Sequence, residues 1–230
     1  MSARRWRPPR ALLFDLDGTL VHSLPDLAAA VDAMLAQYGL PALGDAAIAG
    51  MIGNGSRKLV ERALQASRWC NAPAHSAELL QEAHDRFLQH YQTHLCERSQ
   101  LFPGVADTLP LLRSEGIALA VVTNKPMAFV PPLLESLGIR HHFAVLIGGD
   151  SLTEKKPSPL PLQHACAQLN VAIADSIMVG DSRTDIDAAR AAGMRNIAVS
   201  FGYNHGEPIT ACAPDVIIDH FSQLAGCWRD

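Results

Sequence analysis

The chain has 230 residues, of which 48% are hydrophobic and 18% charged, and its formal net charge is -4. This composition is typical of a globular protein and excludes a disordered or fibrous one. A mildly acidic chain is a poor candidate for nucleic-acid binding through its overall field, so we expect no nucleic-acid partner. The length is sufficient for one ordinary domain with a modest insertion.

Residues 1–10 are rich in arginine, as the start of a secretory signal would be, but no apolar segment follows, because Asp15 and Asp17 come too soon. We expect these ten residues to form a flexible tail. No apolar run approaches the roughly 20 residues that a membrane helix needs. The five cysteines contain no C-x-x-C pair, which predicts reduced thiols. The expected location is the cytoplasm, without a membrane partner.

The segment 23–97, which follows the first predicted strand, shows helical spacing and no convincing strand. Its apolar residues predict four helices, each with one apolar face, so the helices must pack on one another. We therefore predict a helical cap domain of residues 23–97, inserted into an α/β core domain made of residues 11–22 and 98–230. The helices are marked by the apolar positions of 27–38, 48–52, 59–64 and 80–95.

The rest of the chain alternates short apolar runs with helical segments, several of which are followed by a glycine. The runs are nearly continuous, which is typical of parallel strands buried on both faces. The pattern predicts an α/β fold with a doubly wound, Rossmann-like parallel sheet. The predicted strands are Ala11–Leu16, Ile117–Val122, Phe143–Ile147, Ser176–Val179, Asn196–Ser200 and Asp215–Ile218.

Polar residues follow four of these strands where ligands bind in open α/β sheets, at the carboxyl ends. The first strand leads into Asp15 and Asp17, the second into Thr123, the third into Lys156 and the fourth into Asp181 with Asp185. Clustered carboxylates need a cation, and hard oxygen ligands suit Mg²⁺. The lysine and threonine suit an anion. The combination predicts a phosphate held beside a magnesium ion, attacked by water or by a carboxylate.

These residues resemble the signatures of the haloacid dehalogenase superfamily of phosphohydrolases. All four signatures occur in order: Asp15-Leu16-Asp17-Gly18-Thr19-Leu20, Thr123-Asn124, Lys156 ahead of Pro157, and Gly180-Asp181-Ser182-Arg183-Thr184-Asp185. One departure is His22, which stands where the family usually has a carboxylate.

The resemblance implies a role for each residue. Asp15 would be the nucleophile and a metal ligand. Asp17 would be the general acid and base, and its backbone carbonyl would bind the metal. Lys156 would neutralise the nucleophile and phosphate oxygens. The remaining implied metal ligands are Asp181 and Asp185, the latter through water, and the implied phosphate-binding residues are Gly18, Thr123 and Asn124.

A narrower resemblance is to the bacterial phosphoglycolate phosphatases, which carry a helical cap in the same place. It rests on Ser23–Leu27, Gly53-Asn54-Gly55, Thr123–Pro126, Gly148–Ser151 and Phe201–Gly206. The implied reaction is the conversion of 2-phosphoglycolate to glycolate and phosphate, with Mg²⁺ as cofactor and a small phosphate ester as the only partner. A monomer and a homodimer are both compatible with the sequence.

The loop Gly53-Asn54-Gly55 has two interpretations. It is either a turn that needs positive φ, or a loop that closes over the core. In the second case Gly55 and Arg57, or Lys58, would meet the substrate carboxylate.

Other functions remain open from the sequence. They are a phosphatase or phosphomutase for another sugar phosphate, and a phosphonate-cleaving enzyme that uses Lys58. Lys156 and the helical insertion argue against a receiver-like module that keeps phosphate on Asp15, and Asp17 together with Asp181 argues against a dehalogenase, which needs no metal.

Overall fold

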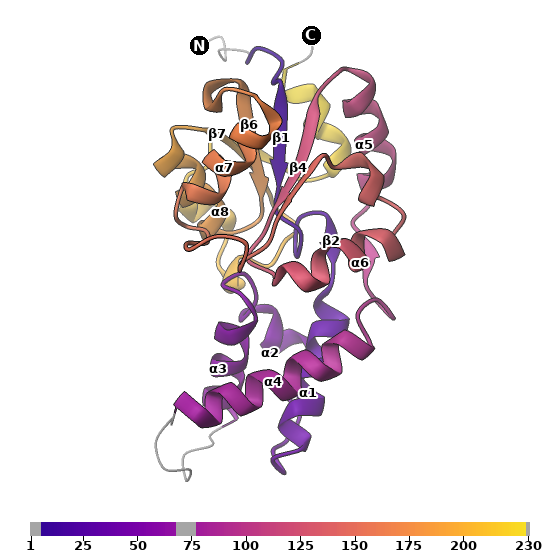
Figure 1. Ribbon diagram of the computed structural model, residues 1–230, viewed down its shortest axis with the longest axis vertical. Helices are drawn as coiled ribbons and strands as arrows, with labels where there is room; N and C mark the ends of the chain where they lie inside the picture. Colours follow the sequence, from indigo (N-terminus) through magenta and orange to yellow (C-terminus); the bar gives the residue numbers. More distant parts are fainter. Residues whose placement is uncertain (1–5, 68–76, 229–230) are drawn as a thin grey trace.

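The structure is a computed structural model that describes residues 6–67 and 77–228. The first half of the predicted tail and Cys70 lie outside the described residues. The described chain has two parts, an α/β part and a group of helices beyond one end of its sheet (Figure 1).

The centre of the α/β part is a six-stranded parallel sheet with the order β5-β4-β1-β6-β7-β8. β1 therefore lies in the middle, with β4 on one side and β6 on the other, as expected for a doubly wound sheet. The predicted α/β fold class is confirmed, and each predicted strand is present with slightly different ends. The bounds are β1 Ala11–Phe14, β4 Ala118–Val122, β5 Val145–Ile147, β6 Ser176–Gly180, β7 Arg195–Val199 and β8 Val216–Ile218.

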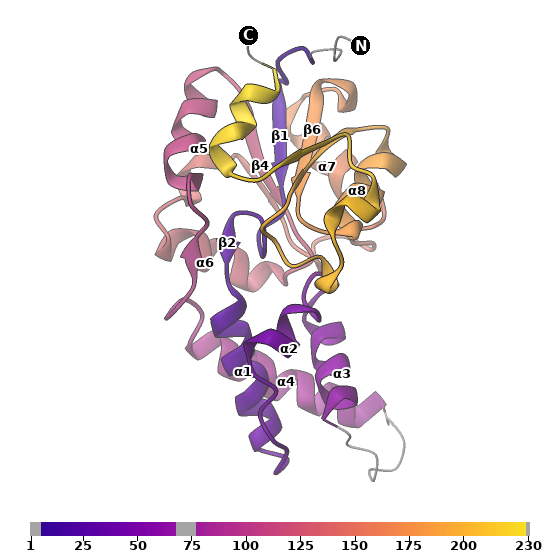
Figure 2. The same cartoon turned by 180° about the vertical axis from the view of Figure 1, so that it is seen from behind.

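Helices cover both faces of this sheet because successive strand residues point to opposite sides. Leu12 and Phe14 of β1 belong to one apolar cluster with α5, α6 and the C-terminal segment, while Leu13 packs with α7 and α8 on the other face. Figure 1 shows α7 in front of the sheet, and Figure 2 shows the yellow C-terminal segment in front of it. The helices are α5 Val105–Ser114, α6 Val130–Ser136, α7 Leu160–Leu169 and α8 Arg183–Ala192.

The four remaining helices lie beyond the carboxyl ends of the strands and have an apolar cluster of their own (Figure 2). α4 packs on α1 and α3, and buried Phe87 and Tyr91 lie in this cluster together with Phe129 of the α/β part. No helix within the described ranges combines the length and apolarity needed to cross a membrane. The bounds are α1 Leu24–Ala36, α2 Asp45–Ala49, α3 Ser56–Ala66 and α4 Ala77–Thr93.

The two connections between the parts run side by side. β2 (Val21–His22) and β3 (Gln100–Leu101) form an antiparallel ribbon that the sequence analysis did not predict. At its cap end, the buried carboxylate of Asp26 accepts hydrogen bonds from the amides of Arg98 and Ser99, at 3.0 and 2.8 Å, and from the Ser99 hydroxyl at 2.6 Å. The outgoing and returning chains are therefore fixed to each other where they enter the helical group.

Candidate active site

The structure brings the predicted polar residues together at the carboxyl edge of the sheet. Asp15 follows β1, Thr123 follows β4, Lys156 lies in the loop after β5, and Asp181 follows β6. All four side chains are buried. This convergence follows from topology, because parallel strands end at one edge and β1 lies between β4 and β6.

A lysine joins two of the carboxylates. The ammonium of Lys156 lies 3.0 Å from Oδ1 of Asp15 and 2.6 Å from Oδ1 of Asp185. Asp185 is fixed at the start of α8, where its Oδ2 accepts hydrogen bonds from the Ser182 amide at 3.0 Å and the Ser182 hydroxyl at 2.7 Å. This capping box positions Asp185 and satisfies amides at the start of the helix. Lys156 thus connects the Asp15 carboxylate to Asp185, whose own position is fixed by the capping box.

Asp181 is oriented through both of its oxygens. Oδ1 accepts a hydrogen bond from the Thr19 hydroxyl at 2.8 Å, and Oδ2 accepts one from the Tyr203 amide at 2.9 Å. Two glycines allow the close approach: a Cβ on Gly18 would lie 2.4 Å from Oδ2 of Asp181, and one on Gly202 would lie 2.1 Å from its Cβ. Gly18 also has a φ of 91°, which disfavours other residues. Gly18 is therefore required for packing against this carboxylate.

The carboxylates of Asp15, Asp181 and Asp185 offer oxygen atoms within 4.8 Å of one another. Burial, reinforced by the charges of Asp185 and Asp15, raises the pKa of Asp181 to about 8. Burial also raises the pKa of Asp15 to about 6, although Lys156 opposes the shift. One ammonium cannot balance three buried carboxylates, so the cluster fits a divalent cation with hard oxygen ligands. The side chain of Asp17, whose backbone carbonyl is the predicted ligand, is not part of this cluster.

The Asp17 carboxylate has other partners. It accepts a hydrogen bond from the Ser23 hydroxyl at 2.6 Å, and its two oxygens lie 3.0 and 3.1 Å from the Lys125 ammonium. Lys125 in turn donates to the hydroxyl of Tyr91 on α4, at 2.7 Å. Burial alone would lower the pKa of Lys125, but the charge of Asp17 and the contact with Tyr91 raise it instead. The ammonium is therefore charged and links the helical part to Asp17.

Neither Lys125 nor Tyr91 had a role predicted from the sequence. Lys125 could have been identified, since it follows Thr123 and Asn124 directly at the end of a strand. Tyr91 could not, because its spacing on α4 is that of a core residue.

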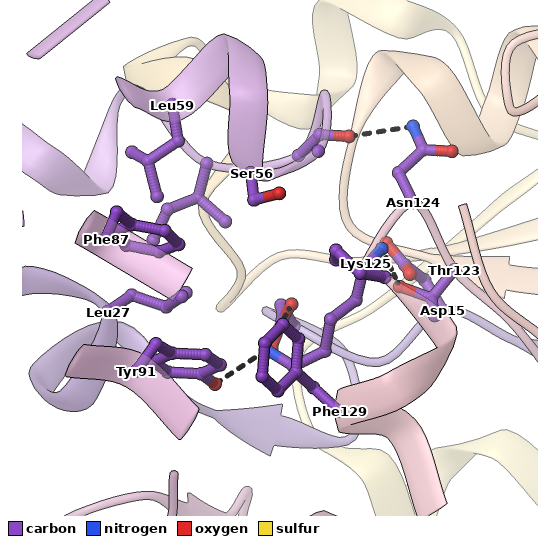
Figure 3. A pocket seen from close by; sticks show the side chains of 15 residues that line it. Asp15, Leu27, Ser56, Leu59, Phe87, Tyr91, Thr123, Asn124, Lys125 and Phe129 are labelled. Carbon is purple, nitrogen blue, oxygen red and sulfur yellow. Dashed lines mark hydrogen bonds and ion pairs between the residues drawn. The ribbon is translucent and has the colours of Figure 1, made fainter. Parts of the chain in front are cut away.

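A pocket lies between the two parts of the molecule (Figure 3). Asp15, Thr123 and Lys125 line its polar side, and apolar side chains that include Leu59 and Phe87 line the other. Figure 3 shows the Lys125 side chain extending toward the Tyr91 hydroxyl. A phosphate at Asp15 would thus have the rest of its molecule directed toward the helices.

The loop 53–55 rests on the sheet edge. The Asn124 side-chain amide donates to the carbonyl of Gly53 at 3.0 Å, and the Lys155 ammonium donates to the carbonyl of Asn54 at 2.9 Å. Gly55 lines the pocket. Gly53 and Gly55 have positive φ, 116° and 90°, so the loop is the expected turn, and it also contacts the α/β part.

The two basic residues predicted for this region lie elsewhere. Arg57 is exposed, and its guanidinium donates to Oε1 of Gln81 at 2.5 Å. Lys58 is exposed and pairs with Glu61 at 2.8 Å. Neither is among the residues that line the pocket.

Comparisons with known proteins agree with this geometry. The model of the haloacid dehalogenase-like hydrolase family matches residues 12–199. A phosphoglycolate phosphatase of Pectobacterium atrosepticum is 46% identical over 94% of this chain and 90% of its own length. One of Yersinia pseudotuberculosis is 45% identical over 96% of this chain and 93% of its own. The crystal structure of a predicted phosphoglycolate phosphatase from Haemophilus somnus superposes with a TM-score of 0.91, at 36% identity, over 96% of this chain and 99% of that one.

The chain therefore belongs to the haloacid dehalogenase-like hydrolase family. It is an enzyme of the phosphoglycolate phosphatase-like group of phosphoric monoester hydrolases. The resemblance inferred from the four signatures is confirmed.

Proposed function

We propose that this enzyme is a magnesium-dependent phosphatase that hydrolyses 2-phosphoglycolate to glycolate and phosphate through an aspartyl-phosphate on Asp15. The observation that carries the proposal is the position of the Asp15 carboxylate. It lies in the pocket beside Thr123, held 3.0 Å from the Lys156 ammonium, with two further buried carboxylates next to it.

In the first step, a carboxylate oxygen of Asp15 attacks phosphorus and the bond from phosphorus to the ester oxygen breaks. Asp17 gives its proton to the leaving oxygen, which departs as the hydroxyl of glycolate. In the second step, water attacks the aspartyl-phosphate and Asp17 accepts its proton. Inorganic phosphate leaves, and Asp15 returns to the carboxylate form.

The other residues stabilise charge and position. Lys156 offsets negative charge on Asp15 and on the phosphoryl oxygens. Thr123 and Asn124, at the end of β4, hold the phosphoryl group, and the Ser23 hydroxyl orients Asp17. A magnesium ion would be held by Asp15, Asp181 and Asp185 with the Asp17 carbonyl, and it would supply Lewis-acid stabilisation of charge on the phosphoryl oxygens. Domain closure is part of the proposal, with the cap spanning residues 23–97 and the core 11–22 and 98–230.

The substrate is proposed from two lines of support. The relatives at 45–46% identity are phosphoglycolate phosphatases, and Gly53 and Gly55 of the loop 53–55 line the pocket beside Asp15, which suits a small ester. We propose no nucleic-acid partner, a cytoplasmic location, and a monomer or homodimer, on the grounds of the sequence alone.

The test is phosphate release from 2-phosphoglycolate and from a panel of sugar phosphates, with Mg²⁺ and with a chelator, for the wild type and Asp15→Asn. Lys58→Met serves as a surface control because Lys58 lies outside the pocket lining. We expect a metal-dependent preference for 2-phosphoglycolate that is lost in Asp15→Asn and kept in the control.

Results that differ from this expectation would lead to different conclusions. Release that survives in Asp15→Asn would exclude Asp15 as nucleophile. A preference for another ester, still lost in Asp15→Asn, would retain the mechanism and replace the substrate. Product analysis completes the test, since transfer of the phosphoryl group back to a sugar would identify a phosphomutase.

A further inference from the structure

Lys125 is the only basic side chain that lines the pocket, as far as residues 6–67 and 77–228 show. Its side chain is buried, and the ammonium lies 2.7 Å from the Tyr91 hydroxyl and 4.6 Å from the centre of the Tyr91 ring. The other buried lysine at this edge, Lys156, is paired with Asp15 and Asp185 and is not among the residues that line the pocket. Lys125 is therefore the cation that a second anionic group of a ligand in the pocket could reach.

The proposed substrate has a carboxylate two bonds from its ester oxygen, and this second anion also needs a partner. The rest of the pocket lining is mostly apolar. It includes Leu27, Leu59 and Phe87 of the helical part and Phe129 of the α/β part. A carboxylate buried against such a lining without a cation or hydrogen-bond donors would cost several kcal/mol. The sequence suggested Arg57 or Lys58 for this role, but both side chains are exposed on α3 with partners of their own.

Tyr91 adds a second donor. Its hydroxyl oxygen accepts the hydrogen bond from Lys125, and this is the one hydrogen bond of the Tyr91 hydroxyl within the described residues. Burial raises the pKa of Tyr91 to about 12, so the hydroxyl stays protonated and can donate. The side chain is 1% exposed and lines the pocket. An ammonium and a hydroxyl 2.7 Å apart can contact the two oxygens of one carboxylate.

We propose that Lys125 and Tyr91 form the subsite for the substrate carboxylate, and so determine the preference for a carboxylate-bearing phosphate ester. The inference rests on the proposed function. When the substrate binds, Lys125 shares its N–H groups between Asp17 and the substrate carboxylate, and Asp17 keeps its hydrogen bond from Ser23. The subsite also joins the two parts of the molecule, because Lys125 follows β4 and Tyr91 lies on α4.

The test compares two esters that differ in the carboxylate, 2-phosphoglycolate and 2-hydroxyethyl phosphate. kcat/KM is measured for both with the wild type, Lys125→Met, Tyr91→Phe and the surface control Lys58→Met. Because Lys125→Met also disturbs Asp17, kcat/KM should fall for both esters. The informative quantity is kcat/KM for 2-phosphoglycolate divided by kcat/KM for 2-hydroxyethyl phosphate. We expect this ratio to fall about tenfold to a hundredfold, which corresponds to one hydrogen bond to a charged group. Tyr91→Phe keeps the ring and should lower the ratio by about threefold to tenfold.

Binding provides a second measurement that does not depend on turnover. In the Asp15→Asn background, Lys125→Met should weaken the binding of 2-phosphoglycolate and leave the binding of 2-hydroxyethyl phosphate nearly unchanged. Calorimetry measures both dissociation constants.

Two results would overturn the inference in different ways. If the wild type hydrolyses 2-phosphoglycolate but Lys125→Met and Tyr91→Phe leave the ratio unchanged, Lys125 acts on Asp17 alone and the subsite is wrong. If the wild type does not act on 2-phosphoglycolate at all, the proposed substrate fails and the subsite fails with it. A ratio that falls in Lys58→Met as strongly as in Lys125→Met would also exclude the assignment.

Discussion

The hydroxyl of Tyr203 accepts a hydrogen bond from the backbone amide of Leu24, the first residue of α1, at 3.1 Å. The backbone amide of the same tyrosine donates to Asp181 at 2.9 Å. One residue of the α/β part therefore contacts both the carboxylate cluster and the point where the chain enters the helices. The hydroxyl also lies 3.1 Å from Nδ1 of His22, which gives a structural partner to the histidine that departs from the family pattern.

Tyr203→Phe should weaken this entry point. The Ser23 hydroxyl, in the N-cap position of α1, bonds to Asp17 instead of capping the helix, so Tyr203 supplies the acceptor for the Leu24 amide. Loss of the acceptor should lower the free energy of unfolding by about 1 kcal/mol. Because the change lies at the hinge of the proposed domain closure, kcat and KM should change together. Urea unfolding and steady-state kinetics measure the two effects, and an unchanged stability would contradict the capping role.

Gly18→Ala tests the packing around Asp181. The added Cβ would lie 2.4 Å from Oδ2 of Asp181 and would have to displace it. We expect metal affinity to fall about tenfold to a hundredfold, as for other residues that support a ligand. Gly39→Ala is the matched control, because Gly39 also has positive φ, 69°, but open space around its Cβ position. The control should lose about 1 kcal/mol of stability and keep its metal affinity. Equal metal affinity in both variants would contradict the packing argument.

The sheet could be predicted because its strands are buried on both faces, which produces continuous apolar runs. β1 illustrates this: Leu12 and Leu13 point to opposite sides, and both are fully buried. The β2–β3 ribbon could not be predicted, since each strand has only two residues and its pairing joins His22 to Gln100 across the whole helical insertion. Two residues carry no recognisable period.

The convergence of Asp15, Lys156 and Asp181 was predictable for a topological reason, since each follows a parallel strand. The direction in which a side chain points from a helix could not be predicted. Arg57 was selected for its charge beside Gly55, but it is the second residue of α3 and its guanidinium turns to Gln81 on α4. The contact between Lys125 and Tyr91 joins residues 34 positions apart, and no local pattern indicates it.

Lys155→Met tests the contact between the loop 53–55 and the sheet edge. The exposed ammonium of Lys155 donates to the carbonyl of Asn54 at 2.9 Å, so the variant loses one bond between the two parts. A partly exposed bond of this kind contributes about 0.5 to 1 kcal/mol, which corresponds to a KM increase of about twofold to fivefold. The Asn124 bond to Gly53 remains, so kcat should change little. A large loss of kcat with unchanged KM would instead place Lys155 in the chemical step.

The carboxylate cluster should make stability depend on pH when no metal is bound. The folded-state pKa of Asp181 is raised to about 8, chiefly by burial, so the folded protein holds a proton that the unfolded chain releases. The free energy of unfolding in a chelator should therefore fall as pH rises from about 7 to 8, a range that lies above the ordinary histidine pKa of about 6.5. One such group contributes a slope of up to about 1.4 kcal/mol per pH unit.

Saturating Mg²⁺ should remove this slope, because a bound cation favours the ionised carboxylates at every pH in the range. Asp181→Asn should remove most of it without metal, since the amide does not titrate. Urea unfolding at several pH values, in chelator and in Mg²⁺, measures the effect in both proteins. Equal slopes in chelator and in Mg²⁺ for the wild type would show that the cation does not bind at Asp181, and would exclude this cluster as the metal site.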